Sequence, residues 1–131
     1  MTKTGANRVS KAVAERFFRN ANSGAPVTAR IYPPEKMGQS SEWLCKIEVQ
    51  GLEAPFERSI VGVDSFQALY LALRLLCVHL DKYAESLTFL DGTAGDCGLP
   101  LIMPWDFGPS LKAEAYRLIE SKILESLNSR R

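Results

Sequence analysis

A long, strongly apolar helix is predicted over residues 65–83, directly after two stretches in which apolar and polar side chains alternate. Asp64 is a good N-cap residue, and Gln67 follows three positions later, as in a capping box. Apolar residues in this segment recur at helical spacing and extend beyond one face: Phe66, Leu69, Leu71, Ala72, Leu73, Leu75, Leu76, Cys77, Val78 and Leu80. Such a helix needs cover on two sides. A sheet can supply one cover, and either the C-terminal helix or a partner chain can supply the other.

The alternating stretches predict a sheet. Strands are expected over residues 12–19, 26–32, 42–50 and 56–63. Residues 12–19 also fit a helix, but the turn-forming residues 20–24 that follow favour a hairpin. Pro33 and Pro34 should end the second strand, and residues 35–41 should form a polar loop. The predicted fold class is α+β, with a four-stranded antiparallel meander packed by the long helix and by a C-terminal helix over residues 111–128, N-capped by Ser110.

The length of 131 residues suits a single domain, residues 1–131. Residues 1–10 are polar and are expected to be flexible, and residues 104–131 form a C-terminal helical addition. A short further strand is weighed at residues 87–90. The longest uninterrupted apolar run has five residues, Leu69–Leu73, which is too short to cross a bilayer. With no signal-peptide pattern, we expect a soluble, cytoplasmic protein without a membrane partner.

Charge is balanced overall but unevenly distributed. The formal net charge is +1, made up of +5 in residues 1–30, −6 in residues 31–111 and +2 in residues 112–131. Basic residues lie near Phe17 and Phe18, a combination that can bind single-stranded nucleic acid. The balanced total and the absence of a nucleic-acid-binding motif argue against that partner.

Catalytic chemistry has little support in the sequence. Cys45 and Cys77 have apolar neighbours and should pack as small hydrophobic residues, whereas Cys97 lies in a glycine-rich loop and is expected to be the exposed cysteine. The single histidine, His79, is two residues from Cys77, and residues at that spacing on a helix do not face each other. We expect no catalytic residue, no cofactor and no metal site.

Three loop carboxylates leave a hydrolase open as an alternative. Asp91, Asp96 and Asp106 lie among glycine and proline residues, where two of them could converge for acid–base work or hold a divalent cation, with Cys97 as a further reactive group. Aspartate in such a loop more often stabilises a turn.

A spaced set of residues resembles a known family. The set comprises Pro26-Val27-x-x-x-Ile31-x-x-Pro34, Trp43-x-Cys45, Gly51, Gly62-Val63-Asp64-Ser65-x-Gln67-Ala68-Leu69-x-Leu71-Ala72-Leu73, Leu90 and Gly98-x-Pro100. Over about residues 12–101 the chain is similar to a family of small bacterial proteins classed only as a domain of unknown function. The resemblance implies an α+β domain with a meander followed by one long helix. It implies no activity, cofactor or catalytic residue.

These observations favour a non-enzymatic bacterial interaction protein of the immunity or antitoxin type, which binds and neutralises a cognate toxin. Charge steering toward a basic toxin points to an acidic set of contact residues, Glu42, Glu48, Glu53 and Glu57. Trp105, Asp106 and Phe107 form a second candidate contact, although packing of the two aromatic residues between the C-terminal helix and the core is the favoured interpretation. The alternatives are a homodimeric structural or accessory protein, and the small hydrolase.

Overall fold

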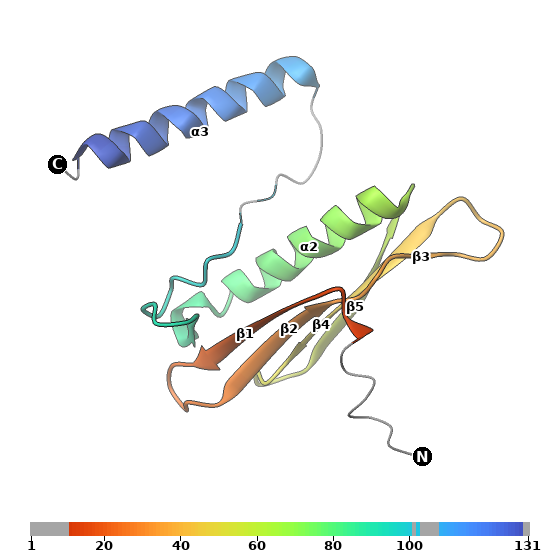
Figure 1. Cartoon of the computed structure of the whole chain (residues 1–131), viewed down its shortest axis with the longest axis horizontal. Helices are drawn as coiled ribbons and strands as arrows, with labels where there is room; N and C mark the ends of the chain where they lie inside the picture. The colour runs from red at the N-terminus through yellow and green to blue at the C-terminus, as the bar shows by residue number, and fades with distance from the viewer. Residues whose placement is uncertain (1–10, 101, 103–107, 130–131) are drawn as a thin grey trace.

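The structure is a computed structural model that describes residues 11–100, 102 and 108–129. The expectations for residues 1–10 and for Trp105, Asp106 and Phe107 lie outside the described residues. The fold is α+β, as predicted, with one antiparallel sheet and a long helix along one of its faces (Figure 1). No helix in the described part of the chain has the length and apolar character needed to cross a membrane.

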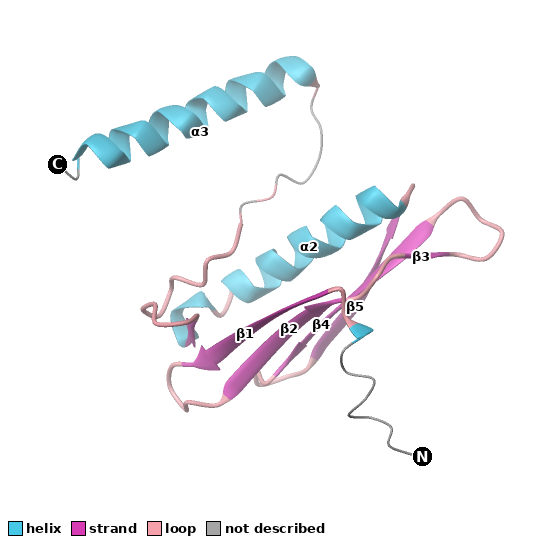
Figure 2. Ribbon diagram, viewed as in Figure 1, coloured by secondary structure: helices cyan, strands magenta, loops and turns pink. Residues whose placement is uncertain are grey.

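The sheet contains the four predicted strands in the predicted meander order. These are β1 (Ala14–Asn20), β2 (Pro26–Ile31), β4 (Trp43–Gln50) and β5 (Phe56–Gly62), and each pairs with the next in antiparallel register (Figure 2). Residues 14–20 are therefore a strand, as the turn chemistry favoured. The turn after β1 uses the Asn20 side chain, whose Oδ1 accepts hydrogen bonds from the backbone N–H groups of Asn22 and Ser23. Gly24 completes the turn at a φ of +78°.

Two short strands extend the sheet. The expectation of a strand near residues 87–90 is met by β6 (Leu87–Thr88), which pairs with β1. The polar loop expected over residues 35–41 is wrong at its start, because β3 (Glu35–Lys36) pairs with the first residues of β4. The register shifts by one residue between the Ile31–Ile47 and Glu35–Leu44 pairs. β2 ends at Ile31, before Pro33 and Pro34, as predicted, and the chain pairs with β4 again after these prolines.

Helix α2 (Ser65–Asp81) begins where the sequence predicts. The Oδ1 atom of Asp64 accepts a hydrogen bond from the Gln67 backbone N–H at 2.8 Å. In return, the Gln67 side chain accepts one from the Val63 backbone N–H at 2.8 Å, so the capping box closes one residue earlier than its usual form. The helix ends two residues before the predicted Tyr83. Its last turn tightens there and leads into the 3₁₀ turn η2 (Ala84–Ser86).

The core lies between α2 and the sheet. β4 supplies its centre, because Cys45, Ile47 and Val49 all point toward α2 and are fully buried. Every second residue of this strand is apolar, so the predicted alternation is confirmed. On the helix, the residues that meet the sheet are Ala68, Ala72, Leu76 and Leu80.

Helix α3 (Pro109–Ser129) begins earlier than predicted, so Ser110 is not its N-cap. The Gly108 carbonyl accepts the first helical hydrogen bond, from the Lys112 N–H at 3.1 Å, and Pro109 occupies the first helical position. None of the described α3 residues is buried. Helix α3 therefore does not cover the second apolar side of α2, although the sequence suggested it as one of two possible covers. Phe66, on the outer side of α2, stays 74% exposed.

Candidate functional site

The face of the sheet opposite α2, which we call the open face, carries a charged network centred on Arg30. The Arg30 side chain comes from β2 and is only about one-tenth exposed although it lies outside the core. Its Nε donates to Glu15 Oε2 at 2.7 Å, and its Nη1 donates to Gln50 Oε1 at 3.1 Å. The same Nη1 lies 3.7 Å from Glu48 Oε1. One guanidinium thus links side chains from three adjacent strands.

Glu48 is the second centre of this network. Its carboxylate also accepts a hydrogen bond from the Tyr32 hydroxyl at 2.7 Å and one from Gln50 Nε2 at 3.2 Å. Burial, reinforced by the hydrogen bond and the charge of Glu48, raises the pKa of Tyr32 to about 12. The Glu48 carboxylate therefore has three partners within the chain: Arg30, Tyr32 and Gln50.

The four predicted contact glutamates do not form one patch. Glu48 and Glu57 are direct cross-strand neighbours on the open face, but Glu57 pairs with Lys46 at 3.6 Å. Glu42 lies before β4 and Glu53 in the connection after it, so these two exposed residues stand at opposite ends of the strand. The register brings Glu48 and Glu57 together and leaves Glu42 and Glu53 apart. The sequence analysis did not identify Arg30 as a site residue. Its position between Ala29 and Ile31 could have indicated it, because on a strand its side chain points to the opposite face of the sheet from theirs.

His79 occupies a packing position. Its imidazole stacks on the Phe56 ring with centroids 3.6 Å apart and an interplanar angle of 11°, and the Tyr83 ring lies 5.4 Å away. Its Nε2 is buried and has no hydrogen-bond partner among the described residues. Burial, together with the nearby charges of Lys82 and Arg58, lowers the pKa of His79 below its ordinary value of 6.5.

The lowered pKa of His79 predicts how the stability of the fold depends on pH. Because the folded-state pKa of His79 is lowered, the stability that its neutral form contributes is complete above about pH 6.5 and is lost as the pH falls through the folded value. His79→Phe keeps the ring stack and removes the unpaired nitrogen. We expect the variant to lose less stability than the parent between about pH 7 and pH 5, measured by urea unfolding at both values. An identical loss in both proteins would contradict this assignment.

Three of the groups proposed for a hydrolase, Cys97, Asp91 and Asp96, lie among the described residues, and Asp106 does not. Cys97 is only 5% exposed, so the expectation that it is the exposed cysteine is wrong. Burial raises the pKa of its thiol, and Asp81 and Asp96 add to that effect, which disfavours the thiolate that nucleophilic chemistry needs. Asp91 and Asp96 are exposed in a loop of tight turns, and the Asp96 N–H donates to the Thr93 carbonyl. Among the described residues, no three His, Cys, Asp or Glu side chains are grouped to hold a metal.

Cys45 and Cys77 are buried, as predicted. Cys97 is buried because its segment folds back over the end of the sheet. The Arg16 Nη1 atom donates to the Gly98 carbonyl at 2.8 Å and lies 3.4 Å from the Cys97 carbonyl. A glycine-rich composition suggested exposure, whereas this long-range contact with β1 and the packing of Cys97 in the core cluster leave it buried.

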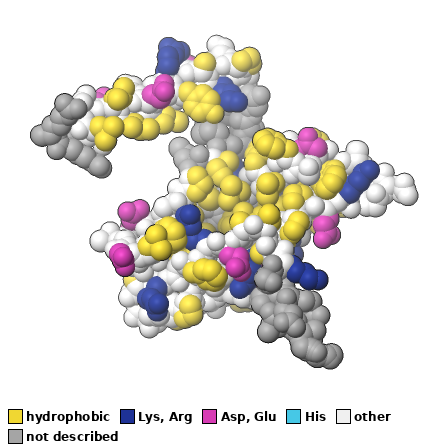
Figure 3. Space-filling model, viewed as in Figure 1, with side chains coloured by type: hydrophobic (Ala, Val, Ile, Leu, Met, Phe, Trp, Pro, Cys, Tyr) yellow, Lys and Arg dark blue, Asp and Glu magenta, His cyan; other side chains and the backbone are white. Residues whose placement is uncertain are grey.

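Helix α3 carries a second candidate binding surface. An apolar stripe runs along it, formed by Leu111, Ala115, Leu118, Ile119, Ile123 and Leu127. We call this set the α3 stripe. Its leucine and isoleucine residues are exposed over 37–63% of their surface, and Figure 3 shows apolar side chains gathered along the helix. A helix in water normally buries such a stripe.

Comparisons with known proteins place the folded part of the chain in a family. The family model for a domain of unknown function, DUF6968, matches residues 14–101, which run from the start of β1 to just beyond the Arg16-bound segment. No curated protein and no solved structure is similar to the chain. The match ends before α3, so the α3 stripe lies outside the family's common part. The chain belongs to this uncharacterised family, as the spaced residues of its sequence suggested.

Proposed function

We propose that the protein is a non-enzymatic interaction protein that binds a protein partner through the α3 stripe. The observation that carries the proposal is the exposure of this stripe along a helix with no buried residue. Most helical stability in proteins comes from packing of the apolar face, and none of the described α3 residues is buried. Binding of α3 in an apolar groove of a partner would supply that packing.

Within this class, we propose the immunity or antitoxin role, in which the partner is a toxin that the protein neutralises. The support is the uneven charge: residues 31–111 carry a net charge of −6. Glu42 and Glu53 are exposed at the two ends of β4 and form no ion pair with another described residue. Their charge would steer a basic partner toward the domain, while α3 would supply the contact area.

The test is a pull-down of the full chain from its host's lysate with two matched variants. Ile119→Glu/Ile123→Glu places charges in the α3 stripe. Ser110→Glu/Asn128→Glu is the matched control, because it also adds two charges and both side chains are exposed. Their described neighbours one turn along the helix, Ala113, Glu114, Leu124 and Glu125, lie outside the α3 stripe. We expect one stoichiometric partner with the parent protein and with this control, and at least a tenfold loss of affinity with Ile119→Glu/Ile123→Glu. Equal capture by all three proteins would overturn the role of α3.

A second candidate function rests on the same observation. The α3 stripe could pack against a second copy of the chain, as in a homodimeric accessory protein. Sedimentation of the purified parent and of Ile119→Glu/Ile123→Glu separates the two candidates. If the parent is a dimer and the double variant is a monomer, the homodimer is favoured. If the parent is a monomer, binding of a different protein is favoured.

A further inference from the structure

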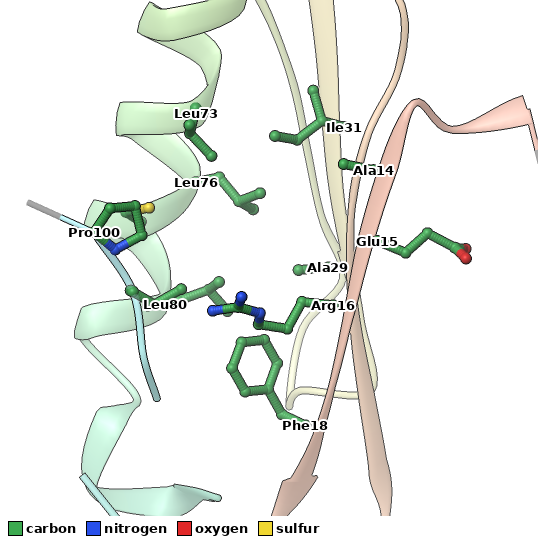
Figure 4. A pocket seen from close by; sticks show the side chains of 12 residues that line it. Ala14, Glu15, Arg16, Phe18, Ala29, Ile31, Leu73, Leu76, Leu80 and Pro100 are labelled. Carbon is green, nitrogen blue, oxygen red and sulfur yellow. The ribbon is translucent and has the colours of Figure 1, made fainter. Parts of the chain in front are cut away.

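A groove separates α2 from the first two strands (Figure 4). Its volume is about 230 Å³, and its walls are mostly apolar. Leu73, Leu76 and Leu80 of α2 form one wall, Ala14, Ala29 and Ile31 of the sheet form the other, and Leu99 and Pro100 lie at one side.

The groove exists because of two small side chains. Ala14 and Ala29 face α2 from β1 and β2, beside the larger Ile31. At the same level, the helix packs mainly over β4 and β5, where larger side chains such as Ile47 and Ile60 meet it. Alanine cannot fill the distance from the outer strands to the helix, so space remains there.

One cation points into this apolar space. Arg16 alternates with Ala14 and Phe18 on the face of β1 that looks toward α2, and Figure 4 shows its guanidinium between the strand and the helix. Its Nη1 holds the Gly98 carbonyl, and its Cζ lies 4.2 Å from the centre of the Phe89 ring. The guanidinium is thereby fixed in place.

The charge of Arg16 forms no ion pair with a described carboxylate, although Asp81 and Asp96 act on the same Cys97 thiol as Arg16 does. Among the described residues, no carboxylate lies within 4 Å of it, and its Nε and Nη2 atoms donate no hydrogen bond. The neighbouring Glu15 points away from the groove and pairs with Arg30 on the open face. The guanidinium offers hydrogen-bond donors in a fixed position, which suits a carboxylate. The apolar wall beside it suits a hydrocarbon chain attached to that carboxylate.

We propose that this groove binds a linear aliphatic carboxylate, with the carboxylate on Arg16 and the chain against the accessible apolar side chains of Leu73, Leu99 and Pro100. The site lies within the family's common part and is independent of α3. Hydrocarbon burial accounts for affinity along the groove, and the charge-assisted hydrogen bonds to Arg16 account for the choice of a carboxylate over a neutral head group.

The test is calorimetric titration of the full chain with hexanoate, octanoate and decanoate. We expect saturable binding that tightens about fourfold for each added methylene, until the chain fills the groove. Octan-1-ol, which has no charge, should bind at least tenfold more weakly than octanoate.

Three variants locate the site. Arg16→Gln removes the charge, and Ala14→Leu fills the groove while leaving Arg16 in place; each should weaken octanoate binding at least tenfold. Arg19→Gln is the matched control, because Arg19 lies on the same strand, is exposed and donates to the Gly24 carbonyl. It should bind octanoate like the parent. Thermal unfolding without ligand shows whether each variant is folded, and Ala14→Leu retains every contact of Arg16 should Arg16→Gln unfold.

Several results would overturn the proposal. One is the absence of saturable binding by the parent at about 10 mM octanoate, well above the millimolar affinity of a weak ligand. Others are equal binding of octanol and octanoate, and unchanged binding by Ala14→Leu. These results test ligand binding in the groove and do not test partner binding through α3. The two proposals can therefore fail independently.

Discussion

Gly62→Ala is expected to lower the free energy of unfolding by about 3 kcal/mol, at the upper end of the cost of overpacking a core. Gly62 is the last residue of β5, and its backbone lies directly against the first turns of α2. A Cβ atom there would overlap the backbone N of Ala68 and stand 2.7 Å from the Ala68 Cα. Ala68 is fully buried, so neither backbone can move aside without opening the core.

Thermal unfolding measures this effect, and we expect the melting temperature to fall by roughly 10 °C. Gly38→Asn is the control, because Gly38 has a φ of +55° that asparagine adopts readily, and a Cβ atom added there would meet no other atom within 4 Å. It should change stability by about 0.5 kcal/mol or less. Equal stability of Gly62→Ala and the parent would show that the strand and helix are not in such close contact.

Arg30→Met is expected to cost about 2–3 kcal/mol, because it removes the guanidinium and leaves the carboxylates it holds without their cation. The Arg30 side chain is largely buried, and it holds Glu15 at 2.7 Å and Gln50 at 3.1 Å. Methionine fills a similar length but donates no hydrogen bond. Urea unfolding at neutral pH gives the loss directly.

A triple variant separates the lost charge from the lost side chain. In Arg30→Met/Glu15→Gln/Glu48→Gln no carboxylate of the network remains unpaired, so we expect part of the stability to return. A triple variant that is less stable than Arg30→Met would mean that these carboxylates are well solvated and that Arg30 acts by packing alone. Arg58→Met is the control: Arg58 is exposed on the edge strand β5 and should be close to neutral.

Local patterns predicted the elements well. The alternation of residues 43–49 defines the buried face of β4, and Asp64 and Gln67 mark the start of α2. Asn20 and Gly24 indicated the hairpin that decides between strand and helix for the first segment. In each case the interaction that determines the element joins residues only a few positions apart, so a short stretch of sequence is enough to predict it.

Contacts between residues far apart in the sequence could not be predicted from such local patterns. Cys97 lies in a loop of turn-forming residues, yet it is buried because Arg16, eighty-one residues earlier, holds that loop. The acidic residues Glu48 and Glu57 suggested a contact surface, but strand register sets them beside Arg30 and Lys46, which balance their charge. Arg16 itself looked like one of several basic residues near the N-terminus.

By itself, the sequence determined the α+β class, the order of the strands and the helix cap, because periodicity and capping depend on near neighbours. Which residues share an open face, where small side chains leave a groove and whether α3 finds cover were decided by the tertiary structure. These outcomes depend on strand register and on helix placement over the sheet, and a shift of one residue in the register of a strand would exchange its two faces. The sequence places the apolar residues along α3, but their exposure and the groove at Arg16 came from the fold alone.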